Sequence, residues 1–237
     1  MNRSLEKAGA WCGLIMMGLF GIFFWGIADL IPPLSPNSSA AKIAKIYAHH
    51  DVRIRLGLGL LILTAPLFIP FVVAIVRQVH RIEGYWGVLS LSQLVAAVVF
   101  PIGFMFPAMV AVAAGFRNSR SPEITQALND VFWLMFVGII GTLVLQAGIL
   151  AVVTFIDRRA TPVFPRWFAY VNIWYAVMAT PGCAVVLFRT GPLAWNGVFA
   201  FWIPLVAFSA WMVTVSVMLL KAIDSEAAEV AAALASA

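Results

Sequence analysis

Asp29 is the first residue of this 237-residue chain whose type and surroundings could support acid/base chemistry. It stands among apolar residues, close to the end of the first apolar run of the sequence. A carboxylate in such surroundings needs a cation or several hydrogen-bond donors, because the loss of water destabilises its charge. Asp29 is therefore expected either to form an ion pair that holds helix ends together or to act as a general acid/base or substrate-binding group.

Asp130 and the adjacent His49 and His50 are the other candidate catalytic residues. Asp130 stands at the start of the fourth apolar run, where a carboxylate can cap a helix and interacts favourably with its dipole. An acid/base role is the alternative, and His49 or His50 could then assist proton transfer. Neighbouring side chains on a helix point about 100° apart, so the two rings do not converge on one ion. We therefore predict no metal site. We also predict no cofactor, because no histidine falls inside an apolar run, as haem ligation in a bundle would require.

Four further polar residues are predicted to bind a substrate on the same side of the membrane. Arg117 and Arg189 each follow a phenylalanine at the end of an apolar run, and Asn129 and Asn196 each open the next run. A chain that crosses the membrane with every run places all four beside the candidate catalytic residues. Side chains within the runs that could anchor a ligand are Gln93, Gln146, Asn172 and Tyr175.

The composition indicates that lipid surrounds most of these residues. Apolar residues make up 63% of the chain and charged residues 11%, and the mean hydropathy is +0.98. A soluble domain is about one quarter charged. The predicted fold is therefore all-α, a polytopic integral membrane helical bundle of about six transmembrane helices, with residues 1–237 in a single transmembrane domain. Runs of about twenty apolar residues place the spans at approximately 9–31, 56–76, 86–115, 129–156, 167–188 and 197–221.

Prolines predict that several spans are kinked, because each proline removes a backbone donor and bends its helix. Four bent spans could outline a cavity lined by Phe, Trp, Met and Ile; kinks that serve packing alone are the alternative. The prolines inside the spans are Pro66, Pro70, Pro101, Pro107, Pro181 and Pro204.

The first loop is predicted to contain a short amphipathic helix. Four of its residues follow the spacing of one helix face, namely Ile43, Ile46, Tyr47 and His50. Such a helix would lie on the membrane surface or across the mouth of the bundle. A plain linker with one docked turn is the alternative.

Two hairpins, 86–157 and 167–224, resemble each other. Asn129 and Asn196 open their second spans, and Asp157 and Asp224 close those spans at the same interval. A duplication would explain the resemblance, but chance is the alternative because transmembrane helices use few residue types. Beyond Asp224 we expect a frayed helical extension without chemistry of its own.

An even number of spans places both termini on one side of the membrane. Basic residues are divided almost equally between the two sides, so the positive-inside rule decides little. The compact basic loops at 77–81 and 157–166 favour cytoplasmic termini in a plasma membrane of the bacterial type. The side opposite to Asp29 is expected to carry basic turns and little else.

Three classes of function agree with these features. No phosphate-binding, metalloprotease or nucleophile-elbow motif is present, and no basic stripe indicates nucleic acid. We favour an integral membrane protein that binds or transports a small, mostly apolar molecule. The alternatives are a membrane-embedded enzyme with isomerase-like acid/base chemistry on a lipophilic substrate, and an accessory or structural subunit of a membrane complex. The lipid bilayer is the expected partner in each case, with a homo- or hetero-oligomer as a further option.

Overall fold

The protein is an all-helical integral membrane protein. The computed structural model describes residues 3–117 and 119–235, and it contains six helical spans that are long and apolar enough to cross a membrane. The spans are, in order, α1 (Arg3–Phe20) with the π-helix η1 (Gly21–Ile27); α3 (Asp51–Thr64), η2 (Ala65–Leu67) and α4 (Phe68–Glu83); α5 (Val88–Gly115); α6 (Pro122–Gly138) and α7 (Gly141–Ile156); α8 (Arg166–Ala179) and η3 (Thr180–Val186); and η4 (Val198–Trp202) with α9 (Ile203–Ala235).

The predicted fold class and the number of spans are confirmed, but most spans are longer than hydropathy indicates. The second span covers 51–83 and the sixth covers 198–235. A hydropathy run ends at the first charged residues, whereas a helix continues through them because its backbone hydrogen bonds do not depend on apolar side chains. The additional turns carry the charged residues that join the helix ends.

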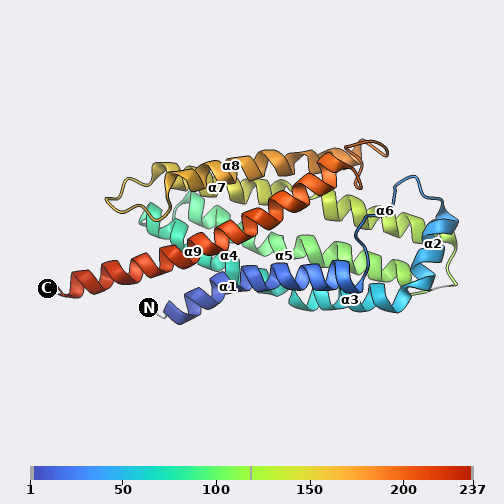
Figure 1. Cartoon of the computed structure of the whole chain (residues 1–237), viewed down its shortest axis with the longest axis horizontal. Coiled ribbons are helices and arrows are strands. Elements are labelled where there is room, and N and C mark those ends of the chain that lie inside the picture. The colour runs from blue at the N-terminus through green and yellow to red at the C-terminus, as the bar shows by residue number, and fades with distance from the viewer. Residues whose placement is uncertain (1–2, 118, 236–237) are drawn as a thin grey trace.

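The spans form one elongated bundle, and both chain termini lie at the same end of it (Figure 1). We call this the terminal end. The remaining helix, α2 (Ala40–His49), crosses the opposite end, which we call the α2 end (Figure 1). α5 packs against α3, α4, α6 and α7, and α1 packs against α4 and α9.

α2 lies where the sequence predicts a helix in the first loop. Ser39 precedes it, and its hydroxyl oxygen accepts a hydrogen bond from the backbone N–H of Lys42 at 3.4 Å. Ile43 and Tyr47 are buried, mainly against α6, whereas Lys45 and His49 are exposed. The helix therefore covers the bundle with one face.

The positions at which the helices are interrupted coincide only partly with the positions of the prolines. The helix type changes at Pro66 in η2 and at Pro181 in η3, but α5 remains one helix through both of its prolines. Two interruptions occur without any proline: the π-helix η1, and the break between α6 and α7 at Ile139 and Ile140. Gly138 and Gly141 flank the break between α6 and α7 and lower the helix propensity there.

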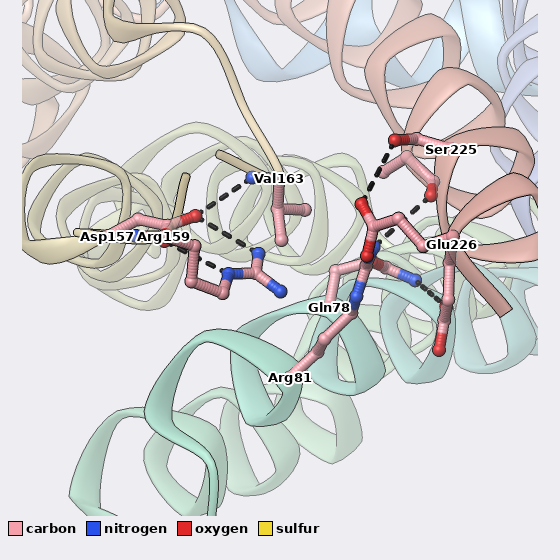
Figure 2. A network of polar contacts seen from close by, with 9 residues as sticks. Gln78, Arg81, Asp157, Arg159, Val163, Ser225 and Glu226 are labelled. Atoms are coloured by element: carbon pink, nitrogen blue, oxygen red, sulfur yellow. Dashed lines mark hydrogen bonds and ion pairs between the residues drawn. The ribbon is translucent and has the colours of Figure 1, made fainter. Parts of the chain in front are cut away.

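The terminal end holds a polar network between α4 and α9 (Figure 2). An Arg81 guanidinium nitrogen lies 2.6 Å from a Glu229 carboxylate oxygen, and another donates to the carbonyl oxygen of Ala222 at 3.3 Å. Gln78 donates to Glu226 at 3.4 Å. The expectation that this side carries little beyond basic turns is therefore wrong, because the basic residues meet carboxylates on α9.

The last turns of α9 are also held by α1. Asp224 pairs with Arg3 and with Lys7, whose Nζ lies 2.7 Å from the carboxylate. α9 continues as a regular helix to Ala235. The expected helical extension beyond Asp224 is thus present, but it is a regular helix that Glu226 and Glu229 join to the bundle rather than a frayed one.

Asp157 organises the loop between α7 and α8. Its side chain is 1% exposed, and its carboxylate accepts hydrogen bonds from the Arg159 side chain and from the backbone N–H of Arg159 and Val163 (Figure 2). Burial alone would raise the pKa of Asp157, but these donors outweigh it and hold the pKa below its usual value. The carboxylate therefore stays ionised and fixes the loop.

Candidate functional site

Asp29 lies at the α2 end in an exposed position. Its backbone adopts a positive φ of 55°, and its carboxylate lies 3.9 Å from a guanidinium nitrogen of Arg53. The Arg53 Nε also donates to the carbonyl oxygen of Ile27 at 3.2 Å. The geometry is that of the ion pair between helix ends, one of the two interpretations of Asp29.

His49 and His50 contact each other at the end of α2. Their rings meet edge to face with centroids 4.7 Å apart, and His49 is exposed. Within the described residues, no group of three His, Cys, Asp or Glu side chains is close enough to hold a metal ion. The two histidines and Asp29 therefore all lie at the α2 end, but they do not form a cluster that could hold a metal ion.

Asn129 and Asp130 form a hydrogen-bonded chain with Tyr47. The Tyr47 hydroxyl donates to Asn129 Oδ1 at 3.3 Å, and Asn129 Nδ2 donates to Asp130 Oδ1 at 3.3 Å. Tyr47 and Asn129 are fully buried. Burial first, and then the charge of Asp130, raise the pKa of Tyr47, so its hydroxyl remains a donor. This chain joins α2 to α6.

The capping interpretation of Asp130 is wrong. α6 begins at Pro122, with Ser121 in the capping position, so Asp130 lies well inside the helix. Apolar residues start at this point in the sequence, but the helix starts earlier, through polar residues at the membrane surface. At the start of the sixth span, Gly197 holds the capping position of η4, and Asn196 directly precedes it.

The structure brings only some of the predicted substrate-binding residues close to a candidate catalytic residue. Arg189 lies close enough for its charge to act on Asp130. Arg117 and Arg189 are exposed, and Asn196 is half-buried. Asn129 is committed to the hydrogen bonds with Tyr47 and Asp130. None of the eight predicted site residues lines any of the three best-defined cavities of the described chain.

A different region, which we call the phenylalanine pocket, offers a cavity inside the bundle. Its volume is about 90 Å³. Phenylalanines from four spans form much of its wall, and small residues of the fifth and sixth spans leave room at its side. The lining residues are Phe20, Phe104, Phe136, Val137, Ile140, Leu143, Ala179, Gly182, Ala200, Phe201, Pro204, Leu205 and Phe208.

The phenylalanine pocket lies where the helices are irregular. Phe20 directly precedes the π-helix η1, Ile140 lies in the break between α6 and α7, and Gly182 lies in η3. Phe201 belongs to the π-helix η4, which is followed by Pro204 in the first turn of α9. Because an irregular turn displaces the side chains of one helix face, four such turns at one level leave space between the spans.

Close approach of two segments also depends on Gly182. A Cβ atom at this position would lie 3.0 Å from the carbonyl oxygen of Val137, tighter than an ordinary contact. Glycine therefore allows η3 to lie against the end of α6. The contact sets the distance across one side of the phenylalanine pocket.

The chemistry of the phenylalanine pocket is apolar. Among the described residues, none of those that line it carries a titratable side chain. Aromatic rings behind the lining extend the same surface: Phe24 stacks on Phe136 with centroids 4.9 Å apart, and Trp133 contacts Phe201 at 6.0 Å. A dry apolar cavity of about 150 Å³ can hold benzene, so this smaller cavity accommodates a few carbon atoms.

The sequence predicted a lining of this type but did not locate it. The prolines at 181 and 204 pointed to two of its walls, whereas the wall at the break between α6 and α7 contains no proline that would mark it. Phe20, Phe104 and Phe136 could not be singled out from other phenylalanines, because only the tertiary structure brings them to one level. Comparisons with protein-family models, curated proteins and solved structures give no match for this chain.

Proposed function

We propose that this membrane protein binds a small apolar molecule, or the end of an apolar chain, in the phenylalanine pocket. The observation that supports this function is that interruptions in four spans coincide at one apolar cavity. Irregular helix turns expose backbone polar groups to hydrocarbon, and short π-helical segments are frequent at functional sites. Binding sites are commonly apolar with few polar groups, as this pocket is.

Binding is favoured over acid/base catalysis by the lining itself. Proton transfer needs a titratable group within about 3 Å of the reacting atom, and the described lining residues offer none. Transport of the bound molecule would extend the same proposal, since broken helices at a central site occur in transporters. We retain cytoplasmic termini in a bacterial-type plasma membrane as part of this proposal.

A hydrocarbon probe can test the phenylalanine pocket directly. We would add a hexadecyl chain with a terminal diazirine to the purified protein in nanodiscs, irradiate, and map the labelled residues by mass spectrometry. We expect label at Ile140 and Phe208. Ala179→Leu and Ala200→Leu each add side-chain volume at fully buried positions of the lining and should abolish this label. Ala210→Leu, at an exposed position of α9, is the matched control and should retain it.

Two results would contradict the proposed function. Label confined to lipid-facing residues in the wild type would show that the cavity stays empty. Equal pocket label in the wild type and in correctly folded Ala179→Leu would show that the label does not report the cavity. Asp29→Asn and Asp130→Asn should leave the pocket label unchanged, because neither residue lines the pocket.

A further inference from the structure

The π-helix η1 packs closely against α3 at a glycine. A Cβ atom at Gly57 would lie 2.5 Å from the carbonyl oxygen of Phe23 and 2.7 Å from the backbone nitrogen of Ala28. These two atoms form a hydrogen bond of 2.9 Å between residues five apart, whereas an α-helix joins residues four apart. Glycine at position 57 therefore lets α3 lie directly against a π-helical hydrogen bond of η1.

Arg53 binds the last residues of η1 from the same face of α3. Residues 53 and 57 share that face, because residues four apart lie one above the other on a helix. The Arg53 Nε donates to the carbonyl oxygen of Ile27 at 3.2 Å, and its Nη2 donates to that of Gly26 at 3.5 Å. The last carbonyl groups of a helix have no partner within the helix, so one planar guanidinium satisfies two of them.

η1 also carries a ring that supports one wall of the phenylalanine pocket. Phe24 lies in η1 and is fully buried. Its ring stacks on Phe20 with centroids 5.0 Å apart and on Phe136 with centroids 4.9 Å apart. Phe20 and Phe136 both line the pocket, whereas Phe24 lies behind them. The position of Phe24 therefore determines where these two lining rings can lie.

We propose that Arg53 is a positioning residue that keeps η1 in its π-helical form and thereby keeps the phenylalanine pocket open. This inference rests on the function proposed for that pocket. π-Helical turns are rare in proteins, so contacts from outside the helix are needed to favour one over an α-helical turn. The guanidinium of Arg53 supplies two such contacts, and Gly57 leaves the room for them.

Loss of these contacts should change the pocket through Phe24. A change of η1 to α-helical hydrogen bonding would move the Ala28 N–H from the carbonyl oxygen of Phe23 to that of Phe24, and it would turn the residues of η1 about the helix axis. The ring of Phe24 would then leave its place behind Phe20 and Phe136. These two rings would be free to fill the cavity.

Arg53→Met tests this inference, because it removes the guanidinium but keeps part of the apolar stem. In nanodiscs, hydrogen exchange of peptides from 21–30 should become about 2- to 10-fold faster, the range for the net loss of one hydrogen bond. The hexadecyl diazirine label at Ile140 and Phe208 should fall about 2- to 10-fold, since fewer molecules keep the pocket open. Arg53→Lys retains a cationic donor of similar reach and should restore most of the label.

Two variants serve as controls. Arg55→Met makes the same substitution on the same helix, but the Arg55 guanidinium pairs with Asp51, so neither the label nor the exchange of 21–30 should change. Asp29→Asn removes the charge that lies 3.9 Å from Arg53 and leaves both contacts of Arg53 with the carbonyl groups in place. It should also retain the label.

The outcomes separate this inference from the proposed function. Unchanged exchange of 21–30 in Arg53→Met would overturn the inference, and so would faster exchange with unchanged pocket label, because Arg53 would then have a structural role alone. Equal losses of label in Arg53→Met and Arg55→Met would also overturn it. A wild type without pocket label would contradict the proposed function instead, and the exchange of 21–30 would then decide whether Arg53 holds η1.

Discussion

Replacing Tyr47 by Phe should loosen α2 from the end of the bundle. The substitution leaves the buried Asn129 Oδ1 without its donor, while the ring can remain in place. Loss of one partner of a buried hydrogen bond costs about 1–3 kcal/mol. The 3.3 Å separation is long for an O–H···O bond, so we expect about 1 kcal/mol. That cost raises the open population of α2 about fivefold.

Hydrogen exchange in nanodiscs, read by mass spectrometry, measures this opening. Peptides from 40–49 should exchange about fivefold faster in Tyr47→Phe, and peptides from α7 should not change. The double variant Tyr47→Phe/Asn129→Leu should cost less than the sum of the two single variants, because the residues interact directly. Unchanged exchange in α2, or strictly additive costs, would refute the role of this hydrogen bond.

The docking of α2 should also depend on pH through Tyr47. Burial, and then the charge of Asp130, raise the pKa of this residue. A detached tyrosine ionises near pH 10, so Tyr47 supports docking below about that pH and the support is lost as the pH rises further. The near-UV tyrosinate titration of the wild type, minus that of Tyr47→Phe, should therefore have its midpoint above about 10. A midpoint at or below the value of free tyrosine would contradict the buried environment.

Two further predictions concern the terminal end. Arg81→Met removes the ion pair with Glu229 and the hydrogen bond to the carbonyl oxygen of Ala222. It should destabilise the last turns of α9 by up to about 1 kcal/mol. Faster hydrogen exchange in 222–235 would verify this prediction, and unchanged exchange would contradict it. Asp157→Asn should lower the melting temperature at neutral pH, because the lowered pKa of Asp157 makes its ionised form stabilising. That contribution is present above the unfolded value near about 4 and is lost as the pH falls further, so the difference between wild type and variant should shrink in acid.

The architecture could be predicted because it depends on local properties of the sequence. Each span needs about twenty apolar residues, and the composition left no other class of fold. The position of α2 followed from the spacing of Ile43 and Tyr47, which share one helix face. Helix ends were less accurate, as for α6, because its first turns are polar and do not differ from a loop in hydropathy.

For the candidate site, the sequence predicted the apolar chemistry of the cavity but not the residues that line it. An apolar cavity beside kinked spans was expected, but its walls come from residues as far apart in sequence as Phe20 and Phe208. Asp29 attracted attention as a carboxylate among apolar neighbours, yet the chain ends a span there, and the side chain reaches Arg53 at the surface. Hydropathy places the end of a span only to within about one helical turn. For Asp29 that difference decides whether the carboxylate is buried in the bundle or exposed at its end. The duplication of 86–157 and 167–224 stays a prediction.

The break between α6 and α7 shows how the chain keeps an irregular turn stable in hydrocarbon. Ile139 has φ −84° and ψ 65°, and the N–H of Ile140 donates to the carbonyl oxygen of Gly138 at 3.0 Å, which is the geometry of an inverse γ-turn. The N–H groups of Ile139 and Leu143 also find local acceptors, at 3.2 and 3.0 Å. Local hydrogen bonds thus replace some of those that a straight helix would make, which offsets part of the cost of an interruption in lipid. The space between the spans therefore follows from a defined turn of the backbone, and this is why we regard the phenylalanine pocket as a feature of the fold rather than a packing defect.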